Sequence, residues 1–261
     1  MTAVAPEPSQ APGQVSRRFE ALDAVRGAAL LWMAAFHFCF DLSNFGFWRQ
    51  DFYRDPFWTV QRTLILSLFL LCAGAAQAIA QAQGQSGARF RRRWLQVAGC
   101  ALLVSAGSWF MFPKSFIYFG VLHGMAVMLV LLRFVTLRFP RSRPWFLPLG
   151  ALALVLPLAA QWVAPEGPAA HWLDSKALNW LGFVTAKPIT EDYVPLLPWI
   201  GVMLWGYALG DLVLSRQPTR VAAPLPTGLR PLAALGRWSL SFYMLHQPVL
   251  IGLLMLAGAR L

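Results

Sequence analysis

Charged residues are scarce in this sequence, and acidic residues are the scarcest of them. Charged residues make up 13% of the 261 positions, with 11 Asp and Glu against 22 Lys and Arg, while 57% are hydrophobic. The mean hydropathy is +0.53. Soluble globular domains contain about 25% charged residues. The composition therefore excludes an ordinary soluble domain and predicts an all-α polytopic membrane protein.

Cysteine is also scarce, which excludes two further classes of protein. Cys39, Cys72 and Cys100 each fall inside an apolar run and form no CxxC pair. Neither a disulfide framework nor a zinc site is indicated, and we expect no metal. The net charge of +11 would suit nucleic acid, but the basic residues lie in short segments between apolar runs. We therefore expect contact with membrane lipids and no nucleic-acid partner.

The N-terminal segment lacks the features of a signal peptide. Residues 1–16 have neither a basic start nor an apolar core of their own, and they are rich in Ala, Pro and Gln without periodicity. Such a composition predicts a disordered tail, on the cytosolic side if the orientation derived below holds. We expect residues 17–261 to form a single transmembrane domain.

Long apolar runs are what the sequence has in abundance. A helix crosses ~30 Å of hydrocarbon in about 20 residues at 1.5 Å per residue. The runs that approach this length are residues 21–42, 63–81, 94–112, 116–134, 145–164, 194–214 and 232–257. The sequence therefore predicts a bundle of about seven transmembrane helices, with the two termini on opposite sides of the membrane.

The basic residues predict the orientation of this bundle. Arginine is concentrated in segments 17–18, 89–93, 133–143 and 216–237, all of which fall on the side of the N-terminus if the runs alternate in direction. Cytoplasmic segments of membrane proteins carry an excess of Lys and Arg. We therefore predict that the N-terminus is cytosolic and the C-terminus is outside.

The first apolar run contains ionisable residues. A charged side chain at the centre of a membrane helix costs at least ~2.5 to 3.5 kcal/mol, so such residues usually face the bundle interior and have a function. Arg26 and His37 are about three helical turns apart and share one face, and Asp41 follows His37 by one turn. We predict that Asp41 holds the imidazole of His37 in one tautomer.

Three histidines are predicted to lie at one depth. Counted along the predicted helices, His37, His246 and His123 lie about 22, 21 and 20 Å from the cytosolic face, and Arg62 lies slightly further out. A shared site explains this agreement. A lone histidine in a membrane helix can equally serve only as a hydrogen bond to a neighbouring helix, and this alternative stays open.

Segments of the sequence resemble a known family. The segment LDAVRGAALLWMAAFHFCFDL, with its Arg and His, is similar to the first helix of transmembrane acyltransferases. The segments YFGVLHGMAVMLVLL, DYVPLLPWIGVMLWGYALG and LGRWSLSFYMLHQPVLIGLL follow in the order expected. Together they resemble the small bacterial members of the heparan-alpha-glucosaminide N-acetyltransferase catalytic-domain family, over most of the chain. A bacterial inner membrane is the implied location.

The resemblance implies an acyltransferase. Such an enzyme takes an acetyl or other acyl group from cytosolic acyl-CoA, with acetyl-CoA as the expected donor, and passes it to a hydroxyl or amine of an envelope glycan or lipid at the outer face. We expect the catalytic group to comprise His37, Asp41, His246 and His123. The expected donor-binding residues are Arg26, Arg237 and Arg92. The expected substrate-binding residues are Arg62, Tyr243 and Gln247.

Two other classes of function are compatible with intramembrane histidines. A haem- or metal-bearing electron carrier would use them as ligands, although no two of the membrane histidines share a helix. A small-molecule transporter would use ionisable residues as a proton relay. The sequence leaves open whether the protein forms a homo-oligomer.

Overall fold

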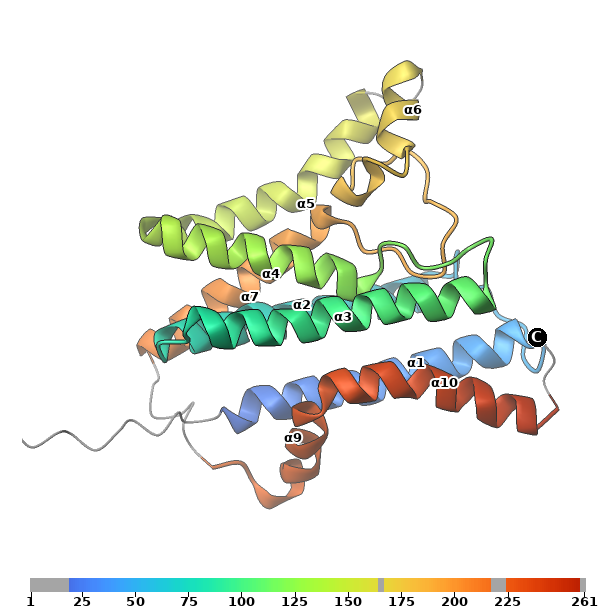
Figure 1. The fold of residues 1–261 in the computed structure, drawn as a ribbon, viewed down its shortest axis with the longest axis horizontal. Coiled ribbons are helices and arrows are strands. Elements are labelled where there is room, and N and C mark those ends of the chain that lie inside the picture. Colours follow the sequence, from blue (N-terminus) through green and yellow to red (C-terminus); the bar gives the residue numbers. More distant parts are fainter. Residues whose placement is uncertain (1–18, 164–166, 217–223, 259–261) are drawn as a thin grey trace, which may run out of the picture.

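The computed structural model describes residues 19–163, 167–216 and 224–258, which form a bundle of long helices (Figure 1). Within these ranges there is no β-strand, only an isolated bridge between Phe119 and Tyr193. The predicted all-α fold is confirmed. The predicted tail, residues 1–16, lies outside the described residues.

The helices follow one another along the chain, with a long connection, residues 175–195, between α6 and α7. In order they are α1 Glu20–Asn44, α2 Pro56–Ala82, α3 Gly87–Met111, α4 Val121–Arg138, α5 Phe146–Val163, α6 Pro168–Asp174, α7 Leu196–Arg216, α9 Arg230–Arg237 and α10 Ser239–Leu256. Short 3₁₀ turns lie between them: η1 Pro140–Trp145, η2 Asn179–Leu181 and η3 Thr227–Leu229.

By length and composition, 6 of the described helices can cross a membrane, namely α1, α2, α3, α4, α7 and α10. The chain is therefore a multi-pass membrane protein. The remaining predicted run forms α5, which contains Pro157, and its predicted end at residue 164 lies outside the described residues. A seventh span through α5 stays a prediction.

Several helices begin elsewhere than predicted. Helix α2 begins at Pro56 rather than at residue 63, because the Asp55 side chain accepts a hydrogen bond from Phe57 N and proline fits the first helical position. Helix α3 begins at Gly87 rather than at residue 94, after the N-cap Ser86. Helix α4 begins at Val121 rather than at residue 116. The Arg-rich segment 89–93 therefore lies on a helix.

The predicted final span, residues 232–257, is wrong as a single helix. The chain leaves helical geometry at Trp238 (φ −98°, ψ 22°), which separates α9 from α10. Helix α9 packs across α1 and does not continue in the direction of α10 (Figure 1). A Cβ atom on Gly236 would lie 1.8 Å from the Asp23 carbonyl oxygen, so only glycine permits this crossing. A depth for His246 counted from residue 232 is therefore invalid.

Helix α7 is the centre of the other half of the bundle. It packs against α2 and α5, and its contact with α2 is very close. A Cβ atom on Gly206 would lie 2.3 Å from the carbonyl oxygen of Leu71, and one on Gly74 would lie 2.1 Å from that of Met203. Small residues at such crossings let membrane helices gain dispersion contacts along their backbones.

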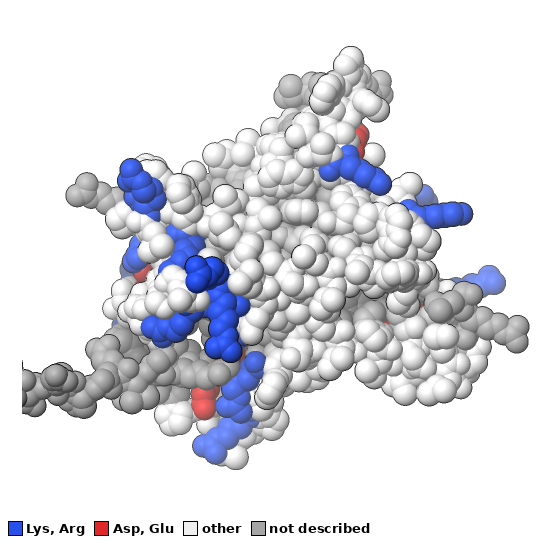
Figure 2. All heavy atoms as spheres, in the orientation of Figure 1, with Lys and Arg blue, Asp and Glu red and all other residues white. Residues whose placement is uncertain are grey.

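The outer surface of the bundle is apolar along its length and charged at its ends. Large apolar side chains point outward, including Phe110 (84% exposed) and Trp162 (86% exposed), as expected for a surface facing lipid. Figure 2 shows Lys and Arg gathered at the end of the bundle where α1 begins, with few at the opposite end. We call the former the Arg-rich end. This distribution agrees with the predicted orientation, which remains a prediction.

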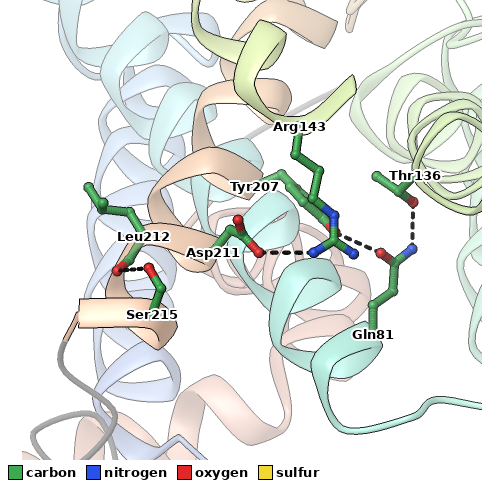
Figure 3. A network of polar contacts seen from close by, with 7 residues as sticks. All are labelled: Gln81, Thr136, Arg143, Tyr207, Asp211, Leu212 and Ser215. Atoms are coloured by element: carbon green, nitrogen blue, oxygen red, sulfur yellow. Dashed lines mark hydrogen bonds and ion pairs between the residues drawn. The ribbon is translucent and has the colours of Figure 1, made fainter. Parts of the chain in front are cut away.

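A polar network ties α2, α4, η1 and α7 together near the Arg-rich end (Figure 3). Gln81 donates to Thr136 Oγ1 at 2.6 Å and accepts from the Tyr207 hydroxyl at 2.7 Å. Arg143 lies beside this pair and donates to Asp211 at 3.3 Å. Buried polar groups need such partners, and these bonds fix how the helices are placed relative to one another.

Candidate active site between the first and last helices

Two histidines from distant parts of the chain form a hydrogen-bonded pair between α1 and α10. His37 Nδ1 lies 2.8 Å from His246 Nε2. The ring centroids are 5.0 Å apart, and the ring planes are inclined by 30°. His246 is buried and His37 is partly buried. The structure thus brings together two of the predicted site residues.

The backbone carbonyl of Tyr243 determines the direction of this hydrogen bond. Its oxygen lies 2.7 Å from His246 Nδ1 and can only accept, so we assign the proton to Nδ1. In neutral His246 the Nε2 atom then carries a lone pair and accepts from His37 Nδ1–H. The remaining nitrogen, His37 Nε2, is left with a lone pair. In this arrangement His37 Nε2 is the ring nitrogen of the pair that can still accept a proton from another molecule.

A second polar pair joins the same two helices. Asp41 is 3% exposed, and its two carboxylate oxygens accept from Gln247 Nε2 at 2.8 and 3.0 Å. We predicted that Asp41 would hold the imidazole of His37. Among the hydrogen bonds of the described residues none joins Asp41 to His37: Asp41 accepts from Gln247, and His37 Nδ1 pairs with His246.

Aromatic side chains surround the histidine pair. Phe36 packs edge to face against Phe52 and Trp58, with ring centroids 5.5 and 5.9 Å apart. The Tyr243 ring lies 5.7 Å from that of His246 and packs against apolar clusters from both sides. No described residue forms a hydrogen bond with the Tyr243 hydroxyl. Apolar side chains and one phenol without a hydrogen bond to a described residue therefore border the imidazoles.

His123 is not part of this pair. Ser105 Oγ donates to the Ile117 carbonyl at 2.7 Å, so it accepts from His123 Nε2 at 3.0 Å. The Gly120 N–H donates to His123 Nδ1 at 3.3 Å. Both ring nitrogens thus form hydrogen bonds that stabilise the N-terminus of α4. In the ranges that the structure describes, no hydrogen bond or ring contact links His123 to the histidine pair, and a common depth for the three histidines stays a prediction.

Arg26 is engaged near the start of α1. Its Nη1 atom lies 3.0 Å from Asp23 Oδ1, and Asp23 is buried beneath α9. The predicted stripe on α1 therefore has two separate parts: an ion pair at the Arg-rich end and, about three turns further along, His37. This contact gives Arg26 a structural role where α9 crosses α1.

The other predicted basic residues are exposed. Arg92 lies on α3 and Arg237 ends α9, both near the Arg-rich end, while Arg62 lies in the second turn of α2. Arg237 directly precedes the break before α10, from which His246 is about 10 Å further along the helix axis. In the described part of the chain, no hydrogen bond or ion pair joins these arginines to the histidine pair.

Asp192 is a polar residue near the bundle that was not among the predicted site residues. Its Oδ2 atom accepts from Val121 N at 2.7 Å, at the start of α4. A Cβ atom on Gly120 would lie 2.2 Å from the same oxygen. Burial raises the pKa of the Asp192 carboxyl above its ordinary value. The motif DYVPLLPW contained this residue, but its partner 71 positions away gave no local signal.

The hydrogen-bonded imidazole pair lies between the first and last helices of a multi-pass bundle, so the chain is a membrane protein with a polar site between its helices. The described residues contain no group of three or more His, Cys, Asp or Glu that could hold a metal ion. The family model described as heparan-alpha-glucosaminide N-acetyltransferase, catalytic, matches residues 18–248. The chain therefore belongs to this family, which confirms the resemblance. Neither a curated protein nor a solved structure matches the chain.

Membership in this family defines the general activity. The family is one of membrane acetyltransferases, in which an acyl-CoA type of donor and, in general terms, a glycan acceptor are implied. The structure adds the arrangement of the polar residues, which follows from hydrogen bonds between α1 and α10. Family membership and these hydrogen bonds together make His37 a candidate catalytic residue.

Proposed function

We propose that the protein transfers an acetyl group from cytosolic acetyl-CoA to a hydroxyl or amine of an envelope glycan or lipid at the outer face of the bacterial inner membrane. His37 is the general base and His246 is its positioning partner. The observation that carries this proposal is the His37–His246 hydrogen bond of 2.8 Å, with its direction set by the Tyr243 carbonyl.

The reaction moves one proton from the acceptor to the leaving thiolate, and this arrangement can relay it. The acceptor hydroxyl or amine attacks the thioester carbonyl while His37 Nε2 removes its proton. The new C–O or C–N bond forms, the C–S bond breaks, and the coenzyme leaves as a thiolate that takes the proton back from the imidazolium. His246 Nε2 strengthens its hydrogen bond to His37 while the charge is present, because the donor is then an ionised ring.

The Tyr243 hydroxyl is the residue that we assign to the developing oxyanion. It is a free donor beside the histidine pair, and a donor directed at the thioester oxygen stabilises charge that develops in the transition state. We expect Tyr243→Phe to lower kcat about 100- to 1,000-fold. The phenyl ring keeps the packing, so thermal stability should change little.

The donor enters from the Arg-rich end in this proposal. Arg237 and Arg92 are exposed there, and guanidinium groups bind phosphate oxygens in a bidentate manner. Arg237 is the better placed of the two, since α10 begins just beyond it and leads to His246. Arg237→Ala should raise KM for acetyl-CoA with little change in kcat, whereas equal KM values would remove Arg237 from the donor site.

The decisive test uses radiolabelled acetyl-CoA and inverted membrane vesicles. Wild-type vesicles should label an envelope glycan or lipid, and His37→Ala should lower the labelling rate by at least ~100-fold. His37→Gln retains an N–H donor for His246 but has no base, so it should lose activity while melting at the wild-type temperature. His171→Ala is the matched control, because His171 is exposed on α6. Equal labelling by wild type and His37→Gln would contradict the proposal.

A further inference from the structure

One oxygen atom beside the histidine pair lacks a partner. Gln247 Nε2 donates to both oxygens of Asp41, but Gln247 Oε1 is buried and has no hydrogen-bond partner among the described residues. Buried side-chain oxygens in native proteins almost always have a partner. An oxygen held without one, next to a proposed base, is suited to accept a hydrogen bond from a substrate.

Asp41 fixes the orientation of the Gln247 amide. If the amide were rotated by half a turn, its oxygen would face two carboxylate oxygens with no proton between them. The buried carboxylate therefore keeps Nε2 toward itself and turns Oε1 away. Without Asp41 the two orientations would be similar in energy, and the position of the acceptor oxygen would be lost.

The second pair lies on the side of the imidazoles that faces away from the Arg-rich end. Helices α1 and α10 both run away from that end (Figure 1). Asp41 is one turn beyond His37 on α1, and Gln247 is one residue beyond His246 on α10. If the donor phosphates bind at the Arg-rich end, the Asp41–Gln247 pair lies on the side from which the acceptor approaches.

We infer that Gln247 is a specificity-determining residue for the acceptor and that Asp41 is its positioning residue, an inference that rests on the proposed acyl transfer. Gln247 Oε1 accepts a hydrogen bond from a second O–H or N–H group next to the nucleophile of the acceptor. This bond aims the nucleophile at the lone pair of His37 Nε2. Gln247 Oε1 therefore discriminates acceptors that carry such a neighbouring O–H or N–H group from acceptors that lack one.

Two variants separate the acceptor oxygen from the contact that holds it. Gln247→Lys keeps an N–H donor for Asp41 and removes Oε1. The double variant Asp41→Asn with Gln247→Glu exchanges the donor and the acceptor, so the contact between the helices survives and an oxygen remains at residue 247. Thermal melting of both variants reports whether the contact and the fold are kept.

The experiment measures acetyl transfer to trans-2-aminocyclohexanol and to cyclohexylamine, which differ in the neighbouring hydroxyl. Wild type and the double variant should prefer the amino alcohol by about fivefold in kcat/KM, the size expected for one neutral hydrogen bond. Gln247→Lys should lose this preference, so that its kcat/KM values for the two substrates become equal and the loss is confined mainly to the amino alcohol. That change in ratio is not produced by a general loss of folding.

Several outcomes would overturn the inference. A Gln247→Lys enzyme that keeps the wild-type preference, or that loses both substrates equally, contradicts a role for Oε1. Wild-type protein that labels membranes in a His37-dependent manner but shows no preference for the amino alcohol contradicts it as well. The absence of any His37-dependent transfer would instead contradict the proposed function.

Discussion

His246 Nε2 lies 2.8 Å from His37 Nδ1, and both atoms belong to rings whose protonation is determined by a backbone carbonyl. The Tyr243 oxygen requires a proton on His246 Nδ1, and this in turn requires a proton on His37 Nδ1. The two imidazoles should therefore be in the same tautomer. A site of this kind is directional, since only His37 keeps an unshared lone pair.

The tautomers can be measured directly. In protein labelled with ¹⁵N histidine, both rings should show a protonated Nδ1 and an unprotonated Nε2 at a pH where they are neutral. His37→Gln and His246→Gln assign the two sets of signals. An Nε2-protonated ring at residue 246 would reverse the hydrogen bond and remove the argument for His37 as the base.

The close helix crossings predict the effect of single methyl groups. Gly206→Ala would place a Cβ atom 2.3 Å from the Leu71 carbonyl oxygen, so α2 and α7 must separate. We expect a loss of ~1 to 3 kcal/mol in unfolding free energy, as for other overpacked sites. Gly99→Ala on α3 is the control, because nothing lies within 4 Å of its added atom. The control should be neutral or stabilising, since alanine favours helix. Equal melting temperatures for the two variants would contradict the crossing.

Local signals in the sequence explain which boundaries could have been predicted. The pair Asp55 and Pro56 is a recognised helix start, and Ser86 before α3 is another. Gly236 and Arg237 are residues typical of a helix end. Counting hydropathy alone overlooked these signals, because the apolar run continues through Trp238 and a run of apolar residues does not show where its backbone turns.

The site is predictable only in part, for a physical reason. The helical period places His37 and Asp41 on one face of α1, and the structure keeps them there. Their partners, His246 and Gln247, are 209 and 206 residues away along the chain. Which side chains of α10 meet His37 and Asp41 depends on how α10 packs after the break at Trp238. No local pattern contains that information.

The network in Figure 3 predicts the cost of removing a hydroxyl group. Tyr207 is 1% exposed and donates to Gln81 Oε1, which would be left without this donor in Tyr207→Phe. A buried acceptor that loses its partner costs ~1 to 3 kcal/mol. Thermal unfolding in detergent should show this loss, whereas Tyr53→Phe should not, because Tyr53 is 58% exposed. Equal stability of Tyr207→Phe and wild type would show that the hydroxyl bond contributes nothing.

Asp192 predicts a pH dependence of stability. Burial raises the pKa of its carboxyl in the folded protein above the ordinary value of 3.8, so the folded state holds a proton that the unfolded state releases. The unfolding free energy should therefore fall as the pH rises from about 3.8 to the folded pKa, by at most ~1.4 kcal/mol per pH unit. Above that window the contribution is constant.

Asp192→Asn tests this prediction, since an amide cannot titrate. The unfolding free energy of wild type minus that of the variant should decrease with rising pH across the window and then level off. The opposite result would be a wild-type protein that gains stability over the variant as the pH rises. In that case the hydrogen bond from Val121 N and the charges of Lys187 and Arg62 outweigh burial, and the fold prefers the ionised carboxylate.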